Sequence, residues 1–223
     1  RTEALPYLHL HVAACSRWPS SGEGRRVSEP VYIVSGYPRS GTSMMMRALI
    51  AGGLDGVYRD ARNAMARRAS DADYAPNPGN ELFELADWEY QAFGFPLAFA
   101  GKLIKAVTVH ARALDVVPGG TRVVFMRRDA EEIRQSYLAF FPGRRTPSVE
   151  QITNEVEWTL RQMRDRRSFE VIEFRYREVL AAPFGHFAEL AGRGWPIDAA
   201  AAAREVDPGQ IRYRAETLAA GVL

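Results

Sequence analysis

The residues best suited to chemistry stand in one short stretch, Val31-Tyr32-Ile33-Val34-Ser35-Gly36-Tyr37-Pro38-Arg39-Ser40-Gly41-Thr42-Ser43. An apolar, β-branched run leads into a turn bounded by two glycines, and the helix-forming segment 44–49 follows directly. A strand, a glycine-rich turn and a helix in this order point backbone N–H groups and the positive end of the helix at one anion. Thr42 and Ser43 add hydroxyl donors. The pattern predicts a phosphate-binding loop.

The cation of this loop is in an unusual position. A loop that binds ATP or GTP for hydrolysis ends in Gly-Lys-Ser/Thr, and its lysine reaches the β- and γ-phosphates. Here Thr42 stands in place of that lysine, and Arg39 lies inside the turn. A guanidinium offers a rigid fork of donors, which suits a single terminal phosphate and requires no metal ion.

A second group of residues points to another phosphate. Segment 121–128 predicts a buried strand that ends in two arginines, and Asp129-Ala130-Glu131-Glu132 has the spacing of a capping box. Ser136 lies seven residues beyond Asp129, which at about 100° per residue returns it to nearly the same side of the helix. Arg128, at the end of the strand, and Ser136 are therefore able to hold one phosphate together.

These two segments resemble the sulfotransferases that use 3′-phosphoadenosine 5′-phosphosulfate (PAPS). Segment 37–43 is similar to their 5′-phosphosulfate loop, in the form seen in bacterial, tyrosylprotein and some carbohydrate members. Arg128 and Ser136 keep the eight-residue spacing of the pair that binds the 3′-phosphate there. The resemblance covers roughly residues 30–195. It implies that PAPS is bound by the following residues: Pro38, Arg39, Ser40, Gly41, Thr42, Ser43, Arg128 and Ser136.

Other parts of the chain match the family less closely. Lys102-Leu103-Ile104-Lys105 resembles a segment that ends the second core strand of soluble members, and 169–183 resembles their late strand and helix. Met44 stands where many of those members have an adenine-stacking tryptophan. Their late Arg-Lys-Gly loop is missing, so Arg212 or Arg214 is left to supply that charge, or no residue does.

Two residues are candidates for the general base. Soluble members have a histidine two residues after the lysine of Leu-Ile-Lys, but Val107 occupies that position and His110 follows three residues later. Tyrosylprotein and glycan members use a glutamate about two dozen residues after the loop, and Asp60 lies in that neighbourhood. The resemblance thus implies Arg39 and Asp60 as catalytic residues, with His110 as the alternative base. Asp60 could equally cap a helix or pair with Arg59.

The order of the expected elements indicates an α/β fold. We expect a three-layer P-loop-type fold with a central, mainly parallel sheet of four to five strands flanked by helices. Ligands bind such sheets at the carboxyl ends of the strands, where Arg39, Lys105 and Arg128 all fall. The expected strands are 31–36, 103–107, 122–127 and 169–174, and the expected helices are 42–52, 60–69, 81–92, 129–141, 148–166 and 176–191.

Composition sets limits on the remaining possibilities. With 223 residues, we expect one domain over 30–223, preceded by a poorly ordered leader over 1–29. A formal charge of +2 gives no reason to expect a nucleic-acid partner. Cys15 is the only cysteine, and no apolar run could span a bilayer, so we expect a cytoplasmic protein. His9 and His11 lack further ligands nearby, which favours a solvated segment over a metal site.

The expected function is transfer of a sulfuryl group from PAPS to a hydroxyl or amine of a small-molecule or carbohydrate acceptor. The donor has no triphosphate to bridge, so we expect no metal. One alternative is a P-loop phosphotransferase with an altered cradle, although no Walker B aspartate ends an apolar strand. Another is an inactive, sulfotransferase-like binding module, which Val107 makes conceivable. We expect the acceptor pocket within 61–100, with Tyr74 as its best candidate residue.

Overall fold

The centre of the molecule is a four-stranded parallel sheet. In the computed structural model, the described residues are 29–60, 82–92, 94–140 and 145–210. The strands follow the order β2-β1-β3-β4, and every neighbouring pair is parallel. Their bounds are β1 Val31–Gly36, β2 Leu103–Lys105, β3 Thr121–Arg127 and β4 Phe169–Arg175.

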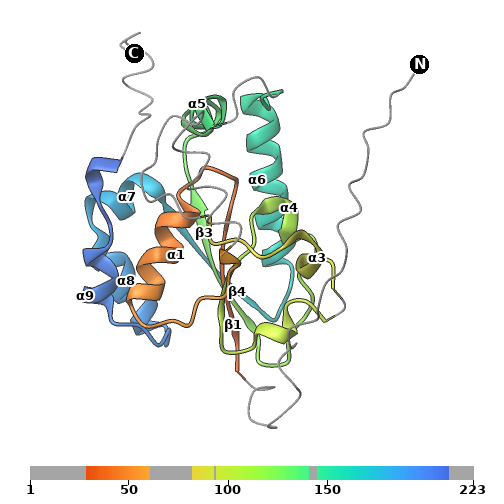
Figure 1. Cartoon of the computed structure of the whole chain (residues 1–223), viewed down its shortest axis with the longest axis vertical. Coiled ribbons are helices and arrows are strands. Elements are labelled where there is room, and N and C mark those ends of the chain that lie inside the picture. The colour runs from red at the N-terminus through yellow and green to blue at the C-terminus, as the bar shows by residue number, and fades with distance from the viewer. Residues whose placement is uncertain (1–28, 61–81, 93, 141–144, 211–223) are drawn as a thin grey trace.

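Helices cover both faces of this sheet, which confirms the expected three-layer α/β fold (Figure 1). One face packs against α1 (Thr42–Ala51), α7 (Tyr176–Ala181), α8 (Pro183–Gly192) and α9 (Ala199–Arg204). The other packs against α3 (Asp87–Tyr90), α4 (Thr108–Ala111), α5 (Ala130–Phe140) and α6 (Val149–Arg164). Two 3₁₀ turns, Leu97–Phe99 and Pro208–Gln210, complete the described elements.

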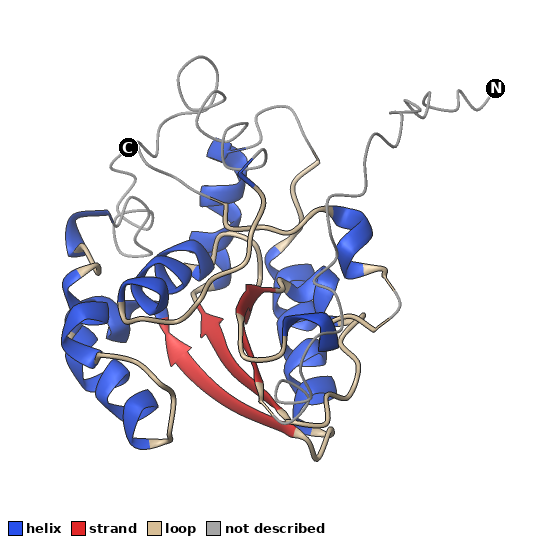
Figure 2. Cartoon of the chain, turned by 60° about the horizontal axis from the view of Figure 1, so that its bottom comes forward, coloured by secondary structure: helices blue, strands red, loops and turns tan. Residues whose placement is uncertain are grey.

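Each central strand contributes to both cores because successive side chains point to opposite faces. On β3, Val124 and Met126 lie in the core under α1, whereas Val123 and Phe125 lie in the core under α6. All four are at most 1% exposed. Burial on both faces explains why these strands appear in the sequence as continuous apolar runs. Figure 2 shows the sheet between its two helical layers.

Two expected helices differ from the structure. The helix expected over 81–92 is reduced to α3, because the chain before it is held by other partners: the Arg59 N–H donates to the Glu84 carbonyl and the Leu85 N–H to the Tyr90 hydroxyl. The helix expected over 176–191 is divided into α7 and α8 at Ala182, whose backbone leaves the helical region directly before Pro183. The short helices α4 and α9 were not expected. The helix expected over 60–69 lies outside the described residues after Asp60.

The connections after β1 and β3 run to opposite faces of the sheet. These strands are neighbours, with Gly36 opposite Met126 at their carboxyl ends. Helix α1 follows β1 on one face and α5 follows β3 on the other. The two connections therefore diverge at the carboxyl ends of β1 and β3, which is the position where open α/β sheets bind their ligands. Both predicted phosphate-binding segments begin there.

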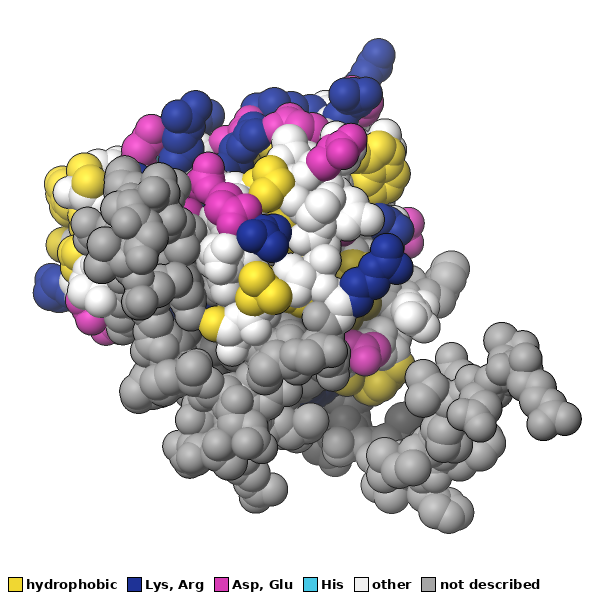
Figure 3. All heavy atoms as spheres, turned by 90° about the horizontal axis from the view of Figure 1, so that it is seen from above, with side chains coloured by type: hydrophobic (Ala, Val, Ile, Leu, Met, Phe, Trp, Pro, Cys, Tyr) yellow, Lys and Arg dark blue, Asp and Glu magenta, His cyan; other side chains and the backbone are white. Residues whose placement is uncertain are grey.

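No helix in the described part of the chain is long and apolar enough to cross a membrane. Among the described residues on the face seen in Figure 3, basic and acidic side chains are interspersed, without a large area of one sign. Apart from Glu29, the expected leader lies outside the described residues.

Candidate functional site

The loop between β1 and α1 depends on two glycines. At Gly36, φ is +143°, and a Cβ would lie 2.5 Å from the Ser40 hydroxyl and 2.6 Å from the Met126 carbonyl oxygen. Gly41 caps α1 with φ +97°, and a Cβ there would overlap the Tyr176 ring. Both positions thus exclude a side chain on conformational and steric grounds. Between them, Arg39 has φ +74°, a region that non-glycine residues seldom occupy and that is often associated with binding sites.

The first turn of α1 provides the donors that the sequence predicts. Helix N–H groups in a first turn have no intrahelical acceptor, and α1 has no acidic residue there to neutralise them. Thr42 is buried and Ser43 is partly buried. Pro38 lies half-buried in the turn. The helix end is therefore suited to an anion.

Ser40 has a different position from the other loop residues. Its N–H closes the turn by donating to the Tyr37 carbonyl at 3.0 Å. Its hydroxyl is buried and has no hydrogen-bond partner among the residues that the structure describes. Ser40 therefore shapes the loop, and its contact with a nucleotide stays a prediction.

Residues of the two predicted phosphate sites are in direct contact. Arg39 donates from Nε to the Ser136 hydroxyl at 3.1 Å, although the residues are 97 positions apart. Arg128 donates from Nη1 to the Arg39 carbonyl at 3.2 Å. Ser136 is only 4% exposed, so the Arg39–Ser136 contact lies in the interior of the protein. The sequence assigned Arg39 to one anion and Arg128 and Ser136 to another. The structure brings these three residues into contact with one another.

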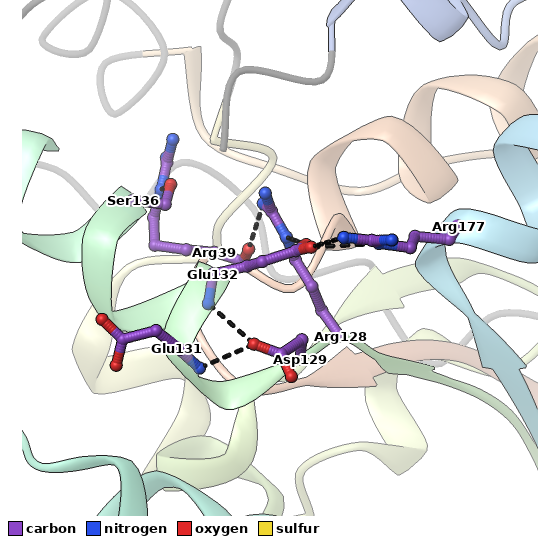
Figure 4. Close-up of polar contacts among 7 residues, drawn as sticks. All are labelled: Arg39, Arg128, Asp129, Glu131, Glu132, Ser136 and Arg177. Carbon is purple, nitrogen blue, oxygen red and sulfur yellow. Dashed lines mark hydrogen bonds and ion pairs between the residues drawn. The ribbon is translucent and has the colours of Figure 1, made fainter. Parts of the chain in front are cut away.

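A buried carboxylate organises the arginines of this site. Glu132 is fully buried and accepts from Arg128 Nε at 2.9 Å through one oxygen and from Arg177 through the other (Figure 4). Arg128 also lies over the Tyr176 ring, with 4.7 Å between the guanidinium carbon and the ring centroid. Asp129 caps α5 as expected, since its carboxylate accepts from the N–H groups of Glu131 and Glu132. Glu132 was expected to complete a capping box, but its carboxylate instead accepts hydrogen bonds from the guanidinium groups of Arg128 and Arg177.

The sequence did not identify Glu132, Tyr176 or Arg177 as site residues. Two signals were available. Glu132 lies four residues after Arg128, which is the spacing of an ion pair at a helix start. Tyr176 and Arg177 directly follow β4, whose carboxyl end lies at the same edge of the sheet. Arg39, Arg128 and Arg177 carry three positive charges, and Glu132 carries one negative charge. These four groups together have a charge of +2, which favours a doubly charged anion.

Lys105 brings a further cation to the loop from the end of β2. Its ammonium donates to the Ser43 hydroxyl at 3.2 Å and to the Leu82 carbonyl at 2.5 Å, and it lies 3.5 Å from a Glu84 carboxylate oxygen. Burial lowers the pKa of Lys105, Glu84 opposes that shift, and the nearby charge of Arg39 adds to it. The loop itself contains no lysine, but Lys105 of the neighbouring strand β2 places its ammonium at the first turn of α1.

The two base candidates occupy different surroundings. Asp60 is exposed and follows Arg59, whose backbone N–H bonds to Glu84, the partner of Lys105. The His110 ring stacks on Tyr90, a residue of the apolar core, with 3.7 Å between the ring centroids. Neither position tests the role of the residue, and Asp60 as base stays a prediction.

Other predicted positions lie outside the described residues: His9, His11, Tyr74, Arg212 and Arg214. Within the described ranges, no group of three histidine, cysteine or acidic residues is arranged to hold a metal ion.

Comparison with known proteins finds a distant structural likeness and no match in sequence. No protein-family model matches the chain, and no curated protein matches it. Among solved structures, it is similar to an unliganded sugar kinase from Janibacter sp. HTCC2649, with a TM-score of 0.41 and 14% sequence identity. The match covers 83% of this chain and 99% of that one.

Proposed function

We propose that this chain transfers a sulfuryl group from PAPS to a hydroxyl or amine acceptor. The observation that supports this proposal best is the contact between Arg39 and Ser136. It joins the segment that resembles a 5′-phosphosulfate loop to the segment that resembles a 3′-phosphate site. Only a few bonds of one ribose separate the 5′ and 3′ positions of a nucleotide, so one bisphosphorylated ligand can contact both.

In this proposal, each part of the site has a separate task. The N–H groups at the start of α1 and the Arg39 guanidinium bind the 5′-phosphosulfate, and Arg128 and Ser136 bind the 3′-phosphate. Arg177 provides the additional positive charge that the sequence left to Arg212 or Arg214. Glu132 fixes the two guanidinium groups beside the 3′-phosphate, which limits the entropy lost when the nucleotide binds.

Catalysis then rests on donors that are already in place. As the sulfuryl group leaves, negative charge develops on the 5′-phosphate oxygen, and donors held near it bind more tightly in the transition state. Arg39 and Lys105 are the charged side chains of the described loop region that can act in this way. Removing one such donor typically lowers turnover by about 10²–10³-fold. The acceptor must also lose a proton to a base, for which Asp60 is the candidate taken from the sequence.

One observation supports a second candidate function, a P-loop phosphotransferase. Lys105 places an ammonium at Ser43, close to where ATP-binding loops have their own lysine. A protein of that kind would bind Mg²⁺-ATP in preference to adenosine 3′,5′-bisphosphate. The same binding experiment therefore separates the two candidates.

Calorimetry with adenosine 3′,5′-bisphosphate tests the main proposal. We expect the bisphosphate to bind without Mg²⁺, and we expect Arg128→Ala to weaken binding at least about tenfold, because it removes a charged hydrogen bond worth about 1.5–3 kcal/mol. Ser136→Ala is the milder second variant, since it leaves the Arg128–Glu132 pair intact. Arg134→Ala is the control: it removes an arginine of the same helix that pairs with Glu131.

The outcomes separate the candidates as follows. Absence of bisphosphate binding to the unmodified chain refutes the PAPS proposal, and tight Mg²⁺-ATP binding in its place supports the phosphotransferase. If the bisphosphate binds, transfer of labelled sulfate from PAPS to a mixed panel of acceptors distinguishes an enzyme from an inactive binding module.

A further inference from the structure

An open pocket of about 560 Å³ adjoins the loop on the side of α6. Two of its lining residues are chain neighbours of the candidate site. Tyr37 begins the loop, and its carbonyl closes the turn with Ser40. Tyr137 follows Ser136, whose hydroxyl contacts Arg39. The volume is in the range of small-molecule sites, and the position is next to the place where the sulfuryl group would be carried.

Nearly every side chain that lines this pocket carries a polar end group, although polar and apolar atoms share the lining surface about equally. One lining residue is a proline, and every other one ends in a hydroxyl, amide, carboxylate or guanidinium group; they include Tyr37, Tyr137, Arg145, Gln151, Asn154 and Glu155. Most small-molecule pockets are instead lined mainly by apolar side chains. An apolar acceptor would cover these groups without pairing them, at a cost of about 1–3 kcal/mol for each group left unsatisfied.

A polyhydroxylated acceptor fits this lining better than an aromatic or alkyl alcohol. Each hydroxyl of a sugar both donates and accepts, and so can pair with amides and carboxylates alike. The tyrosines offer flat apolar ring faces together with hydroxyl groups. Because Arg145 and Glu155 have opposite charges, the lining as a whole does not select a strongly charged acceptor.

Glu155 is the acidic residue of this pocket, and its position is fixed. One carboxylate oxygen accepts from the Thr108 hydroxyl at 2.8 Å, and Thr108 is fully buried. The neighbouring Tyr37 is protonated at neutral pH: burial, followed by the charge of Glu155 and the proximity of Tyr137, raises its pKa to about 12. Glu155 is therefore the carboxylate of this lining that can act as a general base toward a bound acceptor.

We propose that this pocket binds a carbohydrate-like, polyhydroxylated acceptor and that Glu155 accepts the proton of the reacting hydroxyl. The proposal rests on the proposed function, narrows its acceptor class, and assigns the role of base to Glu155 in place of Asp60. The proton moves from the acceptor hydroxyl to the Glu155 carboxylate, and the acceptor oxygen forms a bond to sulfur. The bond from sulfur to the 5′-phosphate oxygen breaks, and its electron pair stays on that oxygen.

The first part of the test compares acceptors. Transfer from labelled PAPS is measured with neutral mono- and oligosaccharides and with phenols and alkyl alcohols. We expect kcat/KM for the best sugar to exceed that for the best phenol at least about tenfold, which corresponds to about 1.4 kcal/mol, or one unsatisfied polar group. A phenol or alkyl alcohol as the preferred acceptor overturns the proposal.

The second part compares variants of α6. Glu155→Gln keeps an oxygen that can accept from Thr108, and we expect it to lower kcat about 10²–10⁴-fold with little change in acceptor KM. Asn154→Ala should raise the acceptor KM and leave kcat nearly unchanged. Thr153→Ala, an exposed residue of the same helix that does not line the pocket, is the control.

Calorimetry separates failure of this proposal from failure of the proposed function. We expect Glu155→Gln and Asn154→Ala to bind adenosine 3′,5′-bisphosphate as the unmodified chain does. If the unmodified chain does not bind it, the proposed function fails and this inference fails with it. If the bisphosphate binds but Asp60→Asn, rather than Glu155→Gln, abolishes turnover, the assignment of Glu155 is wrong and the donor site stands.

Discussion

Replacing Glu132 with glutamine should destabilise the protein and make its stability depend on anions. The substitution keeps the shape of the side chain but removes the charge that faces Arg128 and Arg177. Glu132 and Arg128 are 1% and 7% exposed at their side chains, so the Arg128 charge stays buried and loses its carboxylate partner. Arg177 is 41% exposed and can be solvated, so its contribution is small.

The expected magnitude follows from this burial. Breaking a buried ion pair by removing one partner costs about 3–5 kcal/mol. Because glutamine can still accept one hydrogen bond and Arg177 can reach water, we expect the low end of that range, about 3 kcal/mol. For a domain of this size, that loss lowers Tm by about 6–12 °C. Urea unfolding monitored by tryptophan fluorescence gives the free energy directly.

Ligand dependence distinguishes this explanation from a general packing defect. An anion that binds beside Arg128 replaces the missing carboxylate, so phosphate or adenosine 3′,5′-bisphosphate should restore more stability to Glu132→Gln than to the unmodified chain. The matched control is Glu131→Gln. Its ion pair with Arg134 is about one-third exposed, and such surface pairs contribute about 0–1 kcal/mol.

Two results would refute this reasoning. If Glu132→Gln loses no more stability than Glu131→Gln, the buried pair does not hold the site. If the loss is large but the bisphosphate does not reduce it, the arginines form a structural cluster and not an anion site.

Three further predictions concern the loop and its cations. Gly41→Ala should abolish bisphosphate binding in calorimetry, because a Cβ would overlap Tyr176 at φ +97°; unchanged binding would show that the loop can open. Ser136→Ala should weaken binding about three- to tenfold, less than Arg128→Ala does, because one hydrogen bond to the proposed 3′-phosphate is lost while the Arg128–Glu132 pair stays intact; the same calorimetry measures it. Lys105 should titrate below its ordinary pKa of 10.5. NMR of ¹³C-dimethylated lysine can follow this titration in a Lys102→Arg variant, in which Lys105 is the one remaining lysine. Since the folded chain holds that proton less tightly than the unfolded chain, the free energy of unfolding should rise with pH between the lowered pKa and 10.5, and Lys105→Met should remove this slope.

Local sequence was sufficient for the parts of the fold that depend on patterning. The β1–loop–α1 unit, β3 and α6 could be predicted within one or two residues, because their apolar runs, glycines and caps leave few alternatives. Segment 82–86 could not, because its backbone bonds to Arg59 and to the Tyr90 hydroxyl, and no local pattern encodes those partners. The break between α7 and α8 was signalled by Pro183, which lacks the N–H that a continuous helix needs.

The sequence by itself determined which residues could bind anions, since glycines with positive φ, a helix start and arginines at strand ends are local properties. Only the tertiary structure decided that these groups form one site. The parallel order of β2, β1, β3 and β4 brings Lys105, Arg39, Arg128 and Arg177 to the same edge. Pairings such as Arg39 with Ser136 join positions far apart in the chain, and the burial that makes Glu132 their anchor exists only once both helical layers pack onto the sheet.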